Sequence, residues 1–261
     1  MAKDSFENKV YPVRSDQMPD AVVSRRRSDF YLARTLRDAI ADQVQTWTIG
    51  EVPRVVDLGC GAMPYASLIG PQTGQYTGCD LTGTGAAVEF DPGGTIPLPN
   101  GCATRVVSFQ VLEHVSDVRW YLREAGRLLT DDGELLLSTH GVWPYHPHPQ
   151  DFWRWTRAGL VLELERNGFE VRQVHALVGP AAWTLMFQMG AITLLCGKLG
   201  FLGRALAATV NIIGSVVLPI FDKITPVQFR ETNASVYLVT ARPTKVLMES
   251  YRDGASAKTS N

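Results

Sequence analysis

The chain has 261 residues, of which 45% are hydrophobic and 20% are charged, and its formal net charge is −1. This length is enough for one large domain with a buried core, and a charge so near zero argues against nucleic acid as the main partner. The cysteines lack CxxC spacing, which favours reduced thiols in a cytosolic protein over disulfides or structural zinc.

Residues 1–48 are predicted to form an N-terminal arm and one helix. The first 20 residues are polar and charged and show no secretory signal, so we expect a loose arm there. Apolar side chains then recur at helical spacing, at Phe30, Leu32, Leu36, Ile40 and Val44. This spacing predicts a helix with one apolar face.

Short apolar strands alternate with helices over residues 49–178, which predicts the core domain. The expected strands cover residues 52–58, 76–81, 87–90, 104–109, 134–139 and 170–178, and the longer helices cover 115–129 and 156–167. The segment 231–248 supplies a seventh strand at 235–241, and a disordered tail is expected over 249–261. The alternation predicts an α/β fold with a doubly wound, mostly parallel, seven-stranded sheet.

An apolar helical insert is expected between strands six and seven, over residues 179–230. No charged residue occurs from Ala176 to Gly197 or from Ala205 to Phe221, and each run approaches the roughly 20 residues that span a bilayer. Two apolar helices in a hairpin could roof the active site, form a homodimer interface or dip into a membrane leaflet. Lys198 and Arg204 at the turn match the charge of anionic head groups. Peripheral contact of residues 181–221 with the inner face of the cell membrane is therefore a third possibility, beside an active-site roof and a homodimer interface.

The most informative motif is Val55-Val56-Asp57-Leu58-Gly59-Cys60-Gly61, where an apolar strand ends in an acid and a glycine turn. Glycines let the backbone approach a ligand closely, and Asp80, at the end of the second strand, can accept both ribose hydroxyls. Pro64 stands where the diphosphate signature G-x-G-x-x-G needs its third glycine. We therefore expect an adenosyl ligand with a sulfonium and an amino acid tail, rather than NAD.

Five motifs in order give the chain a resemblance to class I S-adenosylmethionine-dependent methyltransferases of the small-molecule, type 11-like kind. They are the motif above, then Gly78-Cys79-Asp80-Leu81, Phe90-Asp91, Val106-Val107-Ser108-Phe109-Gln110-Val111-Leu112-Glu113-His114-Val115, and Leu128-Leu129-Thr130-Asp131-Asp132-Gly133-Glu134-Leu135-Leu136-Leu137. The resemblance implies S-adenosylmethionine as cofactor, a Rossmann-like fold, and these cofactor-binding residues: Asp57, Gly59 and Gly61 at the amino acid end, Asp80 beside Leu81 at the ribose, Phe90 with Asp91 at the adenine, and Gln110 facing the methionine portion.

Residues 140–156 follow the fifth strand and therefore lie at the carboxyl edge of the sheet, where open α/β folds bind ligands. We expect one of His140, His146 and His148 to act as the general base of methyl transfer, because histidine titrates near neutral pH. The predicted substrate pocket consists of Trp143, Tyr145, Trp153 and Arg154, with Arg154 expected to pair with Asp151. No metal is expected, since the spacing of these histidines and Asp151 matches no metal motif.

The sequence therefore predicts a methyltransferase that acts on a small acceptor, most readily at an oxygen of a lipid-linked sugar or a hydrophobic metabolite. A cytoplasmic protein is expected, with the membrane contact or homodimer described above and no nucleic-acid partner. Two alternatives stay open: a non-catalytic S-adenosylmethionine-binding module anchored through the insert, and a nucleotide-dependent oxidoreductase or epimerase. The absence of a Tyr-x-x-x-Lys pair argues against the latter.

Overall fold

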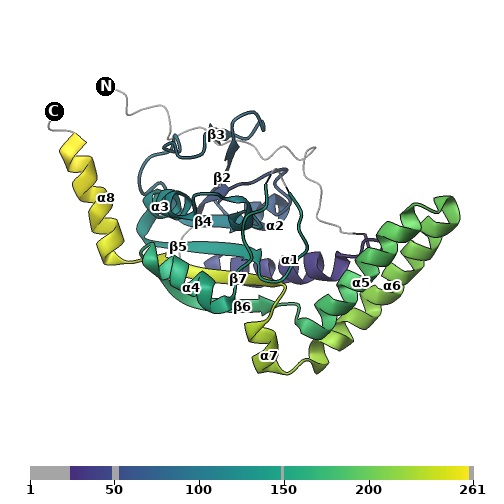
Figure 1. Ribbon diagram of the computed structural model, residues 1–261. Helices are drawn as coiled ribbons and strands as arrows, with labels where there is room; N and C mark the ends of the chain where they lie inside the picture. The colour runs from purple at the N-terminus through teal and green to yellow at the C-terminus, as the bar shows by residue number, and fades with distance from the viewer. Residues whose placement is uncertain (1–23, 49–52, 148–149, 259–261) are drawn as a thin grey trace.

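The computed structural model describes residues 24–48, 53–147 and 150–258. A seven-stranded sheet lies at its centre, with the order β3-β2-β1-β4-β5-β7-β6 (Figure 1). The strands are β1 (Arg54–Leu58), β2 (Gln75–Leu81), β3 (Val88–Phe90), β4 (Ala103–Phe109), β5 (Leu129–His140), β6 (Phe169–Leu177) and β7 (Val236–Pro243). Strands β1 to β5 pair in parallel, whereas β7 runs antiparallel to both β5 and β6. The expectation of a doubly wound, mostly parallel sheet is confirmed.

Helices cover both faces of this sheet. They are α1 (Phe30–Gln45), α2 (Ala66–Ile69), α3 (Val118–Leu128), α4 (Arg157–Arg166), α5 (Pro180–Gly197), α6 (Gly200–Ile224), α7 (Val227–Thr232) and α8 (Lys245–Lys258). Alternate strand residues point to opposite faces. Val56 therefore packs in the cluster that contains α3 and α4, whereas Val55 packs in the cluster that contains α1, α2 and the start of α5. Parallel strands buried on both faces explain the continuous apolar runs in the sequence.

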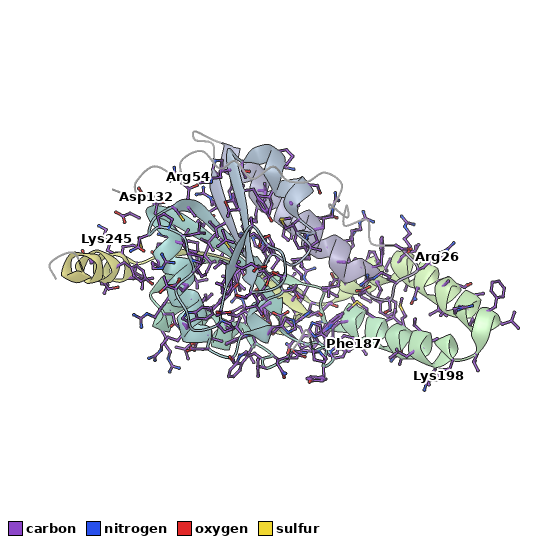
Figure 2. The ribbon with its side chains drawn as sticks, turned by 90° about the horizontal axis from the view of Figure 1, so that it is seen from above. Arg26, Arg54, Asp132, Phe187, Lys198 and Lys245 are labelled. Atoms are coloured by element: carbon purple, nitrogen blue, oxygen red, sulfur yellow. The ribbon has the colours of Figure 1, made fainter. Side chains whose placement is uncertain are left out.

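The expected insert between the sixth and seventh strands consists of α5, α6 and α7, and α5 and α6 form a hairpin that projects away from the sheet (Figure 1). Asp222, near the end of α6, is buried and anchors the root of this hairpin. Its carboxylate accepts a hydrogen bond from the backbone N–H of Gly179 at 2.7 Å and another from the hydroxyl of Tyr31 on α1 at 2.9 Å. In Figure 2, Phe187 lies near the root and Lys198 near the far end.

The C-terminal segment differs from expectation, because residues 245–258 form α8 and the tail predicted as disordered is helical up to Lys258. Its first turns have an apolar side that the composition of the segment obscures. Leu247 packs against the main core cluster and Met248 is buried. The hydroxyl of Tyr251 donates a hydrogen bond to the backbone oxygen of Arg123 on α3 at 2.7 Å. Packing on α3 thus stabilises a helix that intrinsic propensity does not predict.

Candidate active site

A cavity of about 600 Å³ lies at the carboxyl ends of β1 to β4. Its wall includes several residues that the sequence analysis placed at the cofactor: Gly59, Gly61, Asp80, Leu81, Phe90 and Gln110. Each of them ends a strand or begins the turn after it, so the parallel sheet alone brings them to one edge.

The turn after β1 needs glycine at two positions. Gly59 and Gly61 have φ angles of +73° and +50°, a region in which glycine has no steric cost. A Cβ at Gly59 would also lie 2.6 Å from the methyl groups of Val111.

The backbone N–H of Gly61 donates to Oδ2 of Asp80 at 2.6 Å, and the N–H of Leu81 donates to Oδ1 at 2.7 Å. A carboxylate has about four acceptor positions, so both oxygens can still accept from ribose hydroxyls.

Two predicted cofactor residues do not line the cavity. Asp57 is buried below the turn, where its carboxylate accepts a hydrogen bond from the hydroxyl of Tyr76. Burial raises the pKa of Asp57 to about 7, which the hydrogen bond from Tyr76 partly opposes. Asp91 is exposed, although its neighbours Phe90 and Pro92 both face the cavity. The ends of these strands were predicted correctly from the sequence. Whether the carboxylate at each end points into the cavity or away from it could not be predicted.

Gln110 has the conformation expected of a residue held for a ligand. Its φ angle is +57°, which is unfavourable for a non-glycine residue and is found mainly where surrounding contacts impose it. Its side-chain amide donates to the hydroxyl of Ser138 at 3.0 Å, while Oε1 is buried without a hydrogen-bond partner among the described residues. A buried acceptor without a donor at a cavity wall is the position that a ligand ammonium or hydroxyl would satisfy.

The cavity wall also includes aromatic rings and imidazoles, from Trp120, Tyr121, His114 and His146. Of these four residues, only His146 was predicted to belong to the site. The predicted substrate-pocket residues lie elsewhere. The Trp143 ring stacks on His140 at 4.9 Å, Tyr145 is 72% exposed, and Trp153 donates its indole N–H to the backbone oxygen of Val115 at 2.7 Å.

The three histidines predicted as the base occupy different environments. His140 is buried and does not line the cavity, and burial lowers its pKa to about 3, which makes it a poor proton acceptor at neutral pH. His146 lines the cavity, and partial burial lowers its pKa. His148 lies outside the described residues. Among the described candidates, only His146 reaches the cavity.

Arg154 shapes the loop that carries His146 rather than the cavity wall. Its guanidinium donates to both oxygens of Asp151 at 2.6 Å, and to the backbone oxygens of Trp143 and Pro144 at 2.9 Å each. These hydrogen bonds hold the pKa of the Asp151 carboxyl well below its usual range. Asp151 in turn accepts the backbone N–H of His146 at 2.8 Å. The expected pairing of Arg154 with Asp151 is present, and it fixes the position of His146.

No role in the site was assigned from the sequence to Glu113 or His114. Glu113 is fully buried, and burial raises its pKa to about 7. Its Oε2 atom accepts a hydrogen bond from Thr139 at 2.8 Å, and its backbone oxygen accepts the N–H of Phe152 at 2.8 Å. A signal existed, because Glu113 and His114 follow β4 directly and so lie at the ligand-binding edge.

Comparison with known families decides the class of protein. Residues 28–174 match a family model described as a methyltransferase domain. The chain belongs to the methyltransferase domain family. This assignment agrees with the resemblance to class I methyltransferases. The cofactor of the protein is therefore S-adenosylmethionine. The site fits that cofactor, since it combines a glycine turn, an acid at the end of β2 and an unsatisfied buried amide oxygen.

Several solved structures share the fold of this chain. A candidate methyltransferase from Bacillus halodurans C-125 is 16% identical, with a TM-score of 0.50, and the match covers 79% of this chain and 100% of that one. The [4+2]-cyclase SpnF is 17% identical, with a TM-score of 0.50 and coverages of 79% and 80%. A candidate sarcosine dimethylglycine methyltransferase from Galdieria sulphuraria is 11% identical, with a TM-score of 0.50 and coverages of 81% and 86%. No curated protein matches the chain. Identities this low show a shared fold only.

Proposed function

We propose that the protein transfers the methyl group of S-adenosylmethionine to an oxygen of a small acceptor, with a lipid-linked sugar or a hydrophobic metabolite as the acceptor class. One observation supports this most directly. A single cavity of about 600 Å³ is lined by Gly59, Gly61 and Asp80, and also by Trp120, His114 and His146. Cofactor and acceptor would therefore meet in one cavity.

The chain contributes binding, orientation and exclusion of water. When bound, the cofactor supplies an electrophilic methyl carbon: the acceptor oxygen bonds to it while the carbon–sulfur bond breaks and its electron pair stays on sulfur. The aromatic rings of Phe90 and Trp120 provide apolar walls that keep water from competing with the acceptor. The imidazole of His146 is placed to accept the acceptor's hydroxyl proton. Gly61, where nothing lies within 4 Å of the place a Cβ would take, allows the close backbone approach that the cofactor requires.

The alternatives are a non-catalytic cofactor-binding module and a nucleotide-dependent oxidoreductase or epimerase. The fold alone does not separate them, as the cyclase among its structural neighbours illustrates. An activity assay separates them. The protein is incubated with S-adenosylmethionine and a panel of hydroxylated acceptors, and formation of S-adenosylhomocysteine is measured. We expect acceptor-dependent product. Cofactor binding without turnover on any acceptor would favour the binding module, and binding of NAD instead would favour the oxidoreductase.

We also propose that the hairpin of α5 and α6 contacts an anionic phospholipid surface, which would bring an apolar acceptor to the site. Among the described residues, these two helices are long and apolar enough to cross a membrane by length and composition. The far end of the hairpin exposes Leu199, Phe201 and Leu202 at 69%, 76% and 79%. Lys198 and Arg204 are exposed beside them and match the negative charge of such a surface.

The root of the hairpin connects this apolar end to the active-site loop. The ring of Phe187 on α5 contacts Trp143 at 5.6 Å between centroids, and Trp143 stacks on His140 (Figure 2 shows Phe187). The exposed residue Arg26 lies beside the middle of α6, because Asn211 donates its side-chain amide to the backbone oxygen of Arg26 at 2.7 Å. An arginine near the middle and two cations at the end of an apolar hairpin favour an interfacial position over a buried lid.

Vesicle co-sedimentation tests this proposal. Leu202→Asp should abolish binding to vesicles with anionic phospholipid, whereas Val246→Asp, a control of matched exposure (79% and 77%) on α8, should leave it intact. Wild-type protein should bind neutral vesicles weakly. Equal binding by both variants, or a stable dimer that Leu202→Asp dissociates without any vesicle binding, would refute membrane contact by this hairpin.

A further inference from the structure

A buried carboxylate lies beside the two imidazoles of the cavity wall, His114 and His146. Glu113 has no exposed surface, and its carboxylate lies directly behind the cavity wall. Oε2 accepts a hydrogen bond from Thr139 at 2.8 Å, but Oε1 has no hydrogen-bond partner among the described residues. Nε2 of His140 lies 3.5 Å from this oxygen. A carboxylate oxygen buried without a donor is costly unless something positively charged meets it.

Two imidazoles face the same point. One nitrogen of His114, one nitrogen of His146 and one carboxylate oxygen of Glu113 all lie within 4.8 Å of one another. The ligands of a tetrahedral cation at about 2.1 Å would stand about 3.4 Å apart, so small side-chain rotations would close the group around an ion. Both histidines also line the cavity, so an ion here would face the acceptor.

The outer hydrogen bonds orient these imidazoles as ligands. Nδ1 of His114 contacts the backbone oxygen of Gln150, which can only accept, so this nitrogen carries the proton and Nε2 carries the lone pair. Nδ1 of His146 lies 3.4 Å from Oδ2 of Asp151, which can accept a proton held on this nitrogen and so leave the lone pair on Nε2. The guanidinium of Arg154, 3.5 Å from the same Nδ1, can only donate and so favours the other tautomer. A carbonyl or carboxylate at the second ring nitrogen is the usual arrangement around a metal-binding histidine.

We infer that Glu113, His114 and His146 form a binding site for a divalent first-row cation such as Zn²⁺, Mn²⁺ or Co²⁺. Two imidazoles and one carboxylate are suitable ligands for these ions and leave coordination positions open toward the cavity. The site differs from the group of His140, His146, His148 and Asp151 that the sequence suggested and dismissed, since Arg154 occupies Asp151 and His140 is not part of the cluster.

This inference rests on the proposed function for its role but not for its existence. A cation at this point would lower the pKa of an acceptor hydroxyl, so that the hydroxyl proton passes to bulk water. His146 would then be a ligand rather than the base. Glu113 and His114 would hold the ion beside the acceptor oxygen.

Direct metal titration tests the site without any need for activity. Full-length protein freed of metal by a chelator is titrated with Co²⁺ by visible absorption, and with Zn²⁺ and Mn²⁺ by calorimetry. We expect one equivalent to bind, with new ligand-field bands for Co²⁺. His114→Ala, His146→Ala and Glu113→Gln should each lower the affinity at least about 100-fold. His175→Ala removes a part-buried histidine on β6 that contacts Gln43, and it should bind like wild type.

The outcomes separate this inference from the proposed function. No saturable one-equivalent binding, or unchanged affinity in all three site variants, would overturn the metal site. Because Glu113 is fully buried, circular dichroism and thermal unfolding of each variant serve as the folding control. Wild-type protein that binds the cofactor but no cation would refute the metal site alone, and protein that binds a cation but no cofactor would refute the proposed function alone.

Discussion

Gly61 donates its backbone N–H to Oδ2 of Asp80 at 2.6 Å, which joins the turn after β1 to the end of β2. This hydrogen bond holds the two parts of the predicted cofactor site together before any ligand binds. The carboxylate therefore has a fixed orientation, with acceptor positions left for ribose hydroxyls. A preorganised acceptor loses little freedom on binding, so Asp80 should contribute strongly to affinity.

Asp80→Ala should weaken S-adenosylmethionine binding by about 1–3 kcal/mol, or roughly 5–150-fold, because ribose hydroxyls would lose a charged acceptor. Calorimetric titration measures this change. Asp132→Ala removes the same charge from an exposed position at the start of β5, as its label in Figure 2 shows, and should leave the affinity unchanged. Equal affinity of the Asp80 variant and wild type would remove this carboxylate from the site.

Gly59→Ala should destabilise the protein far more than Gly61→Ala. Both positions have positive φ, so both variants carry the strain of a left-handed residue, about 1–2 kcal/mol. Only at Gly59 does the new Cβ also collide with Val111, at 2.6 Å, whereas nothing lies within 4 Å at Gly61. Urea denaturation of both variants checks the order. Adding Val111→Ala to Gly59→Ala should recover part of the loss, and a lack of recovery would show that the collision is not the cause.

Asp57 should make the protein less stable as the pH rises from about 4 to about 7. Burial raises its folded-state pKa to about 7, whereas the unfolded carboxyl ionises near 4, so the unfolded state loses its proton first over this window. The effect is complete above pH 7 and can reach about 4 kcal/mol, at 1.36 kcal/mol per pKa unit. Glu113, with its pKa raised to about 7 by burial, adds a change of the same sign.

The variant Asp57→Asn isolates the contribution of Asp57, because it keeps the acceptor for Tyr76 and cannot ionise. The difference in unfolding free energy between variant and wild type should grow from pH 4 to pH 7 and then stay constant. A difference that is the same at every pH would show that Asp57 does not titrate in this range.

Arg154→Ala should lower turnover while leaving cofactor affinity nearly unchanged. The guanidinium holds Asp151 and two backbone oxygens of the loop that positions His146, but it lies away from Gly59, Gly61 and Asp80. Steady-state kinetics and cofactor titration on the same variant measure the two effects. Arg242→Ala, which breaks only an exposed pair with Glu134, is the control. Loss of cofactor binding in Arg154→Ala would mean that the loop supports the whole cavity.

Much of this structure follows from local sequence. Most strands of the sheet, including β2 at 75–81 and β4 at 103–109, lie within one or two residues of expectation, because buried parallel strands have continuous apolar runs that end at turn residues. The exception is β5, which begins at Leu129, five residues before the expected start at 134. The same rule placed Gly59, Asp80 and Gln110 at one edge, since the carboxyl ends of parallel strands share it.

The catalytic end was harder to predict, because tertiary contacts decide it. The sequence of residues 141–156 has no periodicity. The conformation around Trp143 and Pro144 depends on the hydrogen bonds that their backbone oxygens accept from Arg154. Trp143 therefore stacks inside on His140, while Trp120, on a helix expected to face the core, becomes part of the cavity wall. Likewise α8 forms because Leu247 and Tyr251 find partners on the core and on α3, which no local pattern indicates.

Equilibrium titration of the wild-type protein with S-adenosylmethionine, alongside NAD, tests whether the cavity at the ends of β1 to β4 binds S-adenosylmethionine. We expect saturable binding of one S-adenosylmethionine per chain, weakened in Asp80→Ala, and no binding of NAD. Absence of S-adenosylmethionine binding at millimolar concentration, or preferential binding of NAD, would contradict this expectation.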